Sequence, residues 1–155
     1  MAEDANGNLY ISSSDFHAIR RVDTNGKITT FAGTGEAAWS GDGDTATKAR
    51  LNSPHGLAFD ASGNLYISDR GNHVIRKIDT NGVITTVAGQ GGYRGFSGDG
   101  GAATSAELDS PYDVAFDASG NLYISEVRRI RKVDTNGIIT TFAGDGDGDF
   151  SGDGG

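Results

Sequence analysis

Two short segments carry side chains that could do chemistry, and they stand at equivalent places in an internal repeat. They read Pro54-His55-Gly56 and Pro111-Tyr112-Asp113. The neutral imidazole of His55 could bind Zn²⁺ or another transition metal, or it could act as a general base. The predicted catalytic residues are His55, Tyr112 and Asp113.

The loops that differ most between the repeats hold a second group of candidates, with side chains suited to binding. Their arginines could clamp an anionic ligand, and their carboxylates could bind Ca²⁺ or cap a loop. His73 has a counterpart in His17, so a purely structural role fits it as well. The predicted ligand-binding residues are Trp39, Asp69, Arg70, His73, Tyr93, Arg94, Glu126 and Arg128.

An acidic run near the end of the sequence, Asp145-Gly146-Asp147-Gly148-Asp149, has the alternating carboxylates of a calcium loop. It departs from the EF-hand pattern because Phe150 stands where that loop needs glycine. We expect a flexible acidic loop with weak calcium affinity at most. The sequence also shows no Gly-Lys-Ser/Thr phosphate loop, no nucleophile elbow and no Ser-His-Asp triad.

The elements that must position these residues come from a repeat. Gly-Asn-Leu-Tyr-Ile-Ser begins at Gly7, Gly63 and Gly120, which are 56 and 57 residues apart. Two further markers follow the same period. Asp-Thr-Asn-Gly occurs at 23–26, 79–82 and 134–137, and Ser-Gly-Asp-Gly occurs at 40–43, 97–100 and 151–154. Three markers with one period indicate a repeat architecture.

One full repeat covers about residues 51–107 and predicts four short strands joined by tight turns. The expected strands are Gly56–Phe59, Asn64–Ser68, Val74–Ile78 and Val83–Val87, with a possible short helix in Ala102–Leu108. Asn-Gly between β-rich runs is a strong hairpin signal, and four antiparallel strands per repeat are typical of a β-propeller blade. We expect an all-β chain with a partial blade over 1–50, a full blade over 51–107 and a third blade with its terminal loop over 108–155.

The segments 53–60, 63–69 and 72–79 resemble the NHL-repeat propellers, a family named after its Asn-His-x-Ile-Arg type of run. The Pro-His-Gly-Leu stretch is similar to the peptidyl-hydroxyglycine lyase propellers. That resemblance implies that His55 is a zinc ligand and that Leu57 offers its carbonyl to calcium. Tyr112 replaces the histidine in the next copy, so one chain supplies one such imidazole. Resemblance to lactonase and phosphotriesterase propellers suggests Ca²⁺ or Zn²⁺ as cofactors.

Propellers of this family typically have six blades, whereas this chain holds just under three repeats. The first copy lacks its first strand except for Met1-Ala2, which gives eleven strands for one chain and 22 for two, near the 24 of a six-bladed ring. Exposed blade faces rarely persist in soluble proteins, so we expect a homodimer or a higher homo-oligomer. Ends that fall inside a repeat suggest a fragment or an engineered protein.

The composition excludes several other classes. A net charge of −8 argues against nucleic-acid and anionic-membrane partners, and the chain has neither cysteines nor a signal-peptide pattern. We therefore expect a self-assembling NHL-type propeller that acts as a scaffold or as a binding module for a small-molecule ligand or a protein. The alternative is a metal-dependent hydrolase of a lactone, aryl ester or phosphotriester, or a lyase, with a divalent ion in the central channel.

Overall fold

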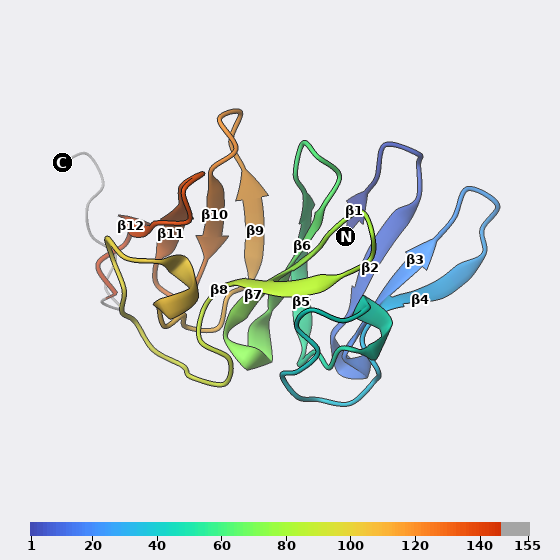
Figure 1. The fold of residues 1–155 in the computed structure, drawn as a ribbon, viewed down its shortest axis with the longest axis horizontal. Coiled ribbons are helices and arrows are strands. Elements are labelled where there is room, and N and C mark those ends of the chain that lie inside the picture. The colour runs from blue at the N-terminus through green and yellow to red at the C-terminus, as the bar shows by residue number, and fades with distance from the viewer. Residues whose placement is uncertain (147–155) are drawn as a thin grey trace.

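The computed structural model is described over residues 1–146, where twelve β-strands form three four-stranded antiparallel sheets (Figure 1). Each sheet is a meander in sequence order. The first contains β1 (Ala2–Glu3), β2 (Leu9–Ser13), β3 (Ala18–Val22) and β4 (Ile28–Ala32). The second contains β5 (Pro54–Phe59), β6 (Leu65–Asp69), β7 (Val74–Ile78) and β8 (Ile84–Ala88). The third contains β9 (Asp113–Phe116), β10 (Leu122–Ser125), β11 (Ile130–Val133) and β12 (Ile139–Ala143).

The recurring Asp-x-x-Gly turns explain why the strands end where they do. In the turn between β5 and β6, Asp60 Oδ1 accepts hydrogen bonds from the backbone N–H groups of Ser62 and Asn64, each at 2.9 Å. Gly63 has a φ of +83°, in the left-handed region that favours glycine. The Asp side chain therefore fixes the turn, and the Gly lets the chain reverse direction.

The prediction of all-β structure with four-stranded blades is confirmed, with local corrections. The third strand of the full repeat has the expected bounds, Val74–Ile78. The expectation that the first copy lacks its first strand is wrong, because Ala2–Glu3 pairs with β2 and brings the count to twelve instead of eleven. In place of the helix considered in Ala102–Leu108 there is one 3-10 turn, η4 (Ala103–Ser105).

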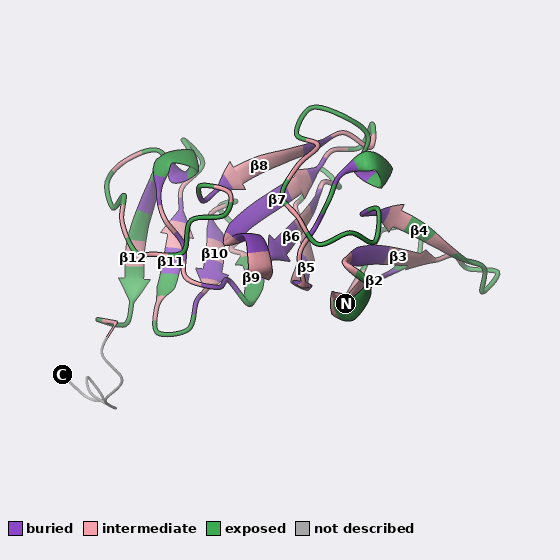
Figure 2. Ribbon diagram, turned by 90° about the horizontal axis from the view of Figure 1, so that it is seen from below, coloured by how far each residue is buried: buried purple, intermediate pink, exposed green. Residues whose placement is uncertain are grey.

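The three sheets lie side by side as the blades of a partial β-propeller, with β5 in contact with β2 on one side and β9 on the other. The hydrophobic core lies between the blades and in the loops that join them (Figure 2). The loops after the first and second sheets fold back over the following blade, and Leu51 and Leu108 in these loops are completely buried. Apolar burial of this kind between neighbours is what stabilises a repeat protein.

The two sides of the blades differ. The β1–β2, β5–β6 and β9–β10 turns lie at the top of Figure 1, and the long loops lie at the bottom. The 3-10 turns η1 (Ser14–Phe16), η2 (Ala46–Lys48) and η3 (Arg70–Asn72) belong to the loop side. Within residues 1–146, no helix has the length and apolar character needed to cross a membrane.

Candidate functional site

Three of the predicted site residues meet on the loop side. His55 is the second residue of β5, Arg70 opens η3, and Tyr112 directly precedes β9 of the next blade. Arg70 Nη2 donates a hydrogen bond to Tyr112 Oη at 2.9 Å, and Arg70 Cζ lies 4.5 Å from the centroid of the Tyr112 ring. The His55 and Tyr112 rings meet edge to face with centroids 5.6 Å apart. We call His55, Arg70 and Tyr112 the rim cluster.

The backbone of the two blades fixes the position of the rim cluster. The Gly56 N–H donates to the Tyr112 carbonyl at 2.8 Å, so β5 and the segment before β9 are directly joined. A Cβ on Gly56 would collide with Asp113, and only glycine allows this close approach. Asp113 itself is exposed, and its N–H donates to Ser125 Oγ at 3.0 Å. Leu57 is buried in the core between blades 1 and 2.

The donor set of the rim cluster fits hydrogen bonding better than metal binding. A zinc site needs three or four protein ligands, and calcium needs six to eight oxygens. In residues 1–146, no group of three or more His, Asp or Glu side chains is placed to hold a metal ion. The residues around His55 therefore do not fit either cofactor. The cluster instead offers an imidazole, a guanidinium and a phenol to a ligand.

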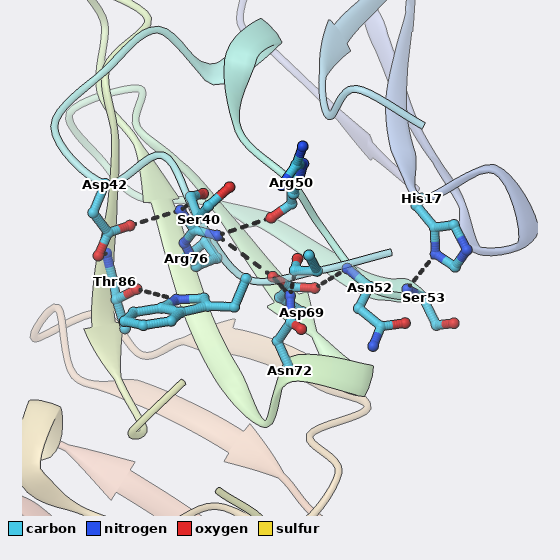
Figure 3. A network of polar contacts seen from close by, with 12 residues as sticks. His17, Ser40, Asp42, Arg50, Asn52, Ser53, Asp69, Asn72, Arg76 and Thr86 are labelled. Carbon is cyan, nitrogen blue, oxygen red and sulfur yellow. Dashed lines mark hydrogen bonds and ion pairs between the residues drawn. The ribbon is translucent and has the colours of Figure 1, made fainter. Parts of the chain in front are cut away.

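Asp69, also predicted to bind a ligand, is fully buried in a polar network (Figure 3). Its carboxylate accepts hydrogen bonds from the Asn52 N–H at 2.7 Å and from Asn72 Nδ2 at 2.8 Å. Arg76 Nη1 lies 3.5 Å from Asp69 Oδ2. Burial raises the pKa of Asp69 to about 6, because the ionised form loses its hydration. This carboxylate is used inside the fold and is not presented at the rim.

Glu126 occupies the same position in blade 3 and behaves in the same way. It accepts the Asp109 N–H at 2.9 Å, and Arg131 Nη1 lies 3.9 Å from its Oε2. Burial raises the pKa of Glu126 to about 7. Asp69 therefore links the end of β6 to the segment before β5, and Glu126 links the end of β10 to the segment before β9.

His17 and His73 connect one blade to the next. Both have left-handed backbone conformations, with φ of 49° and 57°. His17 Nδ1 accepts the Ser53 N–H at 3.0 Å, and His73 Nδ1 accepts the Ser110 N–H at 3.1 Å. Burial lowers the pKa of His73, which favours the neutral imidazole that this hydrogen bond needs. The repeated histidines therefore hold the segment before the following blade.

The remaining predicted binding residues lie apart from the rim cluster. Trp39 packs over Gly91 of the next loop and donates from Nε1 to Thr86 Oγ1 at 3.2 Å. Trp39 and Tyr93 line an open groove of about 450 Å³ between the two long loops.

The two remaining predicted residues are exposed arginines. Arg94 pairs with Asp109 at 2.7 Å, and Arg128 donates to the Gly146 carbonyl at 3.3 Å. Of the acidic run, 147–149 lies outside the described residues, as does Phe150.

The interaction that sequence reasoning missed is a repeated ion pair between blades. Arg76 is fully buried and donates at 2.6 Å to Oδ1 of Asp42, which belongs to the Ser-Gly-Asp-Gly loop that follows the preceding blade (Figure 3). Arg131 contacts Asp99 in the same way at 2.6 Å. The available signal was that an Arg in each third strand recurs with an Asp in each loop. We call the Arg76–Asp42 contact and its repeat, Arg131–Asp99, the loop latch.

The repeated blades, the docked loops and the left-handed histidines define an NHL-repeat β-propeller, of which residues 1–146 form a part. The sequence profile of the Teneurin NHL domain matches residues 34–97 and 93–151. The chain therefore belongs to the teneurin NHL domain family. Human Teneurin-1 is 32% identical over 154 residues, an alignment that covers 88% of this chain and 6% of that protein.

Solved structures share the fold. A structural genomics protein of unknown function from Bacteroides thetaiotaomicron has a TM-score of 0.73 and 29% identity, over 81% of this chain and 32% of that one. An auxiliary nutrient binding protein from Bacteroides ovatus has a TM-score of 0.66 and 27% identity, over 88% of this chain and 35% of that one. The chain thus spans about a third of these structures and a small part of Teneurin-1.

Proposed function

We propose that this chain is a self-assembling NHL propeller that serves as a non-enzymatic binding module, with its ligand site at the rim cluster. The observation that carries the proposal is the meeting of His55, Arg70 and Tyr112 from two blades. A guanidinium held against an aromatic ring is oriented in advance, so it loses little freedom when a ligand binds. We expect a small solute that carries hydroxyl or carboxylate groups.

The other predicted residues strengthen this choice by their own contacts. Asp69, Glu126 and His73 are engaged within and between blades, whereas Tyr112 of the rim cluster is exposed. The relative from Bacteroides ovatus is named for nutrient binding, and that name supports a binding role in this family of folds. A fold hosts many functions, so the name guides the choice of ligands to test and goes no further.

The metal-dependent hydrolase is the less favoured alternative. It would need Ca²⁺ or Zn²⁺ at His55, with Tyr112 and Asp113 close to the reacting atoms. The described residues around His55 supply one imidazole and no cluster of carboxylates. General-base catalysis would also need a partner that orients the imidazole. His55 contacts the edge of an aromatic ring in this structure.

Ligand-dependent thermal stabilisation tests the proposal. The chain is screened against monosaccharides, disaccharides and short carboxylates, since a bound ligand raises the melting temperature. The shift should disappear in Arg70→Ala and persist in Arg94→Ala, which removes an exposed arginine that is paired with Asp109. Aryl-ester, lactone and phosphotriester hydrolysis is measured in parallel. Hydrolysis that is abolished by a chelator and by His55→Ala would replace the binding role with the alternative.

A further inference from the structure

The groove between the two long loops is separate from the rim cluster, and none of the rim-cluster residues lines it. Trp39 comes from the first loop and Tyr93 from the second, and Thr86 of β8 and Thr104 of η4 also belong to the lining. Its volume of about 450 Å³ falls within the range of about 300–1,000 Å³ that is typical of small-molecule sites. The groove therefore has the size to hold a ligand of its own.

The buried side chain of Asn72 connects the two loops that form the groove. Its Nδ2 donates to the Ala38 carbonyl at 2.7 Å, directly before Trp39 in the first loop. The Asn72 carbonyl accepts the Gly92 N–H at 3.0 Å, directly before Tyr93 in the second loop. Both aromatic residues thus follow a backbone group that is fixed by the same residue. A preformed groove of this kind loses little freedom when a ligand binds.

The indole of Trp39 offers its ring surface to a ligand and not its N–H group. Nε1 donates to Thr86 Oγ1 at 3.2 Å, and the ring lies on the backbone of Gly91, where a Cβ would collide with it. Trp39 is nevertheless 45% exposed, and Tyr93 is 65% exposed. Proline-rich peptides also dock on aromatic rings, but their backbone carbonyls need donors, and this N–H is already used. The arrangement favours stacking over recognition of a peptide backbone.

The charges of the groove favour a neutral ligand. Its lining contains no Lys, Arg or His, and its one carboxylate belongs to Asp42. Asp42 Oδ1 accepts a hydrogen bond from the buried Arg76 at 2.6 Å, and Oδ2 accepts the Thr86 N–H at 3.0 Å (Figure 3). An anionic ligand would meet no cation in the lining. A cationic ligand would meet a carboxylate whose charge is already balanced by a guanidinium.

Polar atoms with spare hydrogen-bonding capacity lie among the aromatic rings. Gln90 Nε2 donates to the Ser105 carbonyl at 2.7 Å, which fixes the amide, while Oε1 accepts no hydrogen bond within residues 1–146. In the same part of the chain the hydroxyl groups of Tyr93 and Thr104 have no hydrogen-bond partner. The face of an aromatic ring attracts weakly positive C–H groups. A pyranose has C–H groups on its faces and hydroxyl groups around its edge, so it matches both parts of the lining.

In the next repeat a side chain of the protein lies against the equivalent aromatic ring. Phe96 stands at the position of Trp39, directly before Ser-Gly-Asp-Gly. Arg129 Cζ lies 3.8 Å from the centroid of the Phe96 ring, and a Cβ on Gly146 would collide with the same guanidinium. Val74, fully buried, takes the place of Arg129 in the blade beside Trp39. Within residues 1–146 no cation lies over the Trp39 ring, which stays available to a ligand.

We infer that this groove is a second ligand site, which takes a neutral saccharide. The sugar ring stacks on Trp39 and Tyr93, and its hydroxyl groups bond to Gln90 and Thr104. This site goes beyond the proposed function, because it uses no residue of the rim cluster.

Fluorescence tests the inference directly, because Trp39 is the only tryptophan in the sequence. The full chain is titrated with the neutral disaccharides cellobiose, maltose and lactose, and with glucuronate and choline as charged comparisons. At least one disaccharide should change the Trp39 emission in a saturable way, and the two charged solutes should not. Calorimetric titration of the same samples measures the affinity without relying on the emission.

Four variants locate the binding. Tyr93→Ala and Gly91→Ala should each weaken it at least about fivefold, since one removes a ring and the other displaces the indole. The φ of Gly91 lies outside the left-handed region, so alanine fits the backbone there. Tyr93→Phe keeps the ring and should stay within about threefold of the original affinity. Phe16→Ala removes an exposed ring that does not line the groove and should stay within about twofold. Melting temperatures verify that each variant is folded.

The outcomes separate this site from the rim cluster. Unchanged emission and no heat of binding with all three disaccharides overturn the inference. A response to choline or glucuronate alone overturns it too, because the ligand would then be charged. A disaccharide whose thermal shift is lost in Arg70→Ala, and which leaves the Trp39 emission unchanged, binds at the rim cluster. That result would support the proposed function and overturn the groove site.

Discussion

Removal of the Arg76 side chain is the sharpest test of what holds the blades together. Arg76 is fully buried and faces four acceptors. These are Asp42 at 2.6 Å, the Ser40 carbonyl at 3.1 Å, the Arg50 carbonyl at 3.4 Å and Asp69 at 3.5 Å. Arg76→Ala would leave the Asp69 carboxylate buried with no cation beside it. Breaking a buried pair from one side costs about 3–5 kcal/mol, a large part of a typical domain stability of about 5–15 kcal/mol.

Urea unfolding at one fixed protein concentration measures this loss. With a slope of about 2 kcal/mol per molar urea, the midpoint should fall by about 2 M. Lys77→Ala is the matched control. It lies next in the same strand, is half-buried and has no ion pair within residues 1–146, so it should cost about 1 kcal/mol or less. The loss in Arg76→Ala should also be smaller at pH 5 than at pH 8, since Asp69 is then protonated and needs no cation. Equal midpoints for the two variants would refute the reasoning.

Three further outcomes are expected from unfolding experiments. The native-state pKa is raised to about 6 for Asp69 and to about 7 for Glu126, so the fold favours the protonated form of each carboxyl group. The protonated groups contribute up to about 3 kcal/mol each to the stability of the fold. This contribution is complete below about pH 4 and is lost as the pH rises through about 6 for Asp69 and about 7 for Glu126. Asp69→Asn with Glu126→Gln should therefore flatten the stability profile between pH 5 and 8, and an unchanged profile would contradict this. His73→Ala should cost about 1–2 kcal/mol through the lost acceptor, whereas His73→Asn, tolerant of positive φ, should cost less. Gly41 and Gly26 both have positive φ, so replacing either with alanine strains the backbone, at a cost of roughly 1 kcal/mol for Gly26→Ala. Gly41→Ala should cost well over that amount, because its Cβ would also lie 2.7 Å from Cα of Ala49. Similar urea midpoints for the two variants would argue against this packing.

Much of the fold follows from the repeat, because strand alternation and Asp-x-x-Gly turns are local signals. Val74–Ile78 was predicted to the residue for this reason. β5 begins at Pro54, two residues before the predicted Gly56, because Pro54 pairs with Asp69 beyond a register shift. Within this irregular stretch Gly56 bonds to the next blade, a contact that no alternation pattern contains. The two-residue strand Ala2–Glu3 is too short to show any period.

The candidate site was predictable only in part. Antiparallel topology places His55, Arg70 and Tyr112 on one side of the blades, since loops of one kind share a side. That Arg70 would stack on Tyr112 depends on the packing angle between two blades, which the sequence of one repeat does not encode. The burial of Asp69 was missed for a related reason. Arg76, the cation beside Asp69, also pairs with Asp42, which lies 34 residues earlier in the sequence, in the preceding repeat.

The direction of the loop latch has a consequence for synthesis of the chain on the ribosome. Both long loops within residues 1–146 take their partners from strands that are translated later, so Asp42 emerges well before Arg76 and Thr86. A newly made blade must therefore wait, with its loop unpartnered, until most of its successor has left the exit tunnel. Folding would trail translation by about one blade, and a pause between repeats would prolong the exposure of apolar loop residues to chaperones.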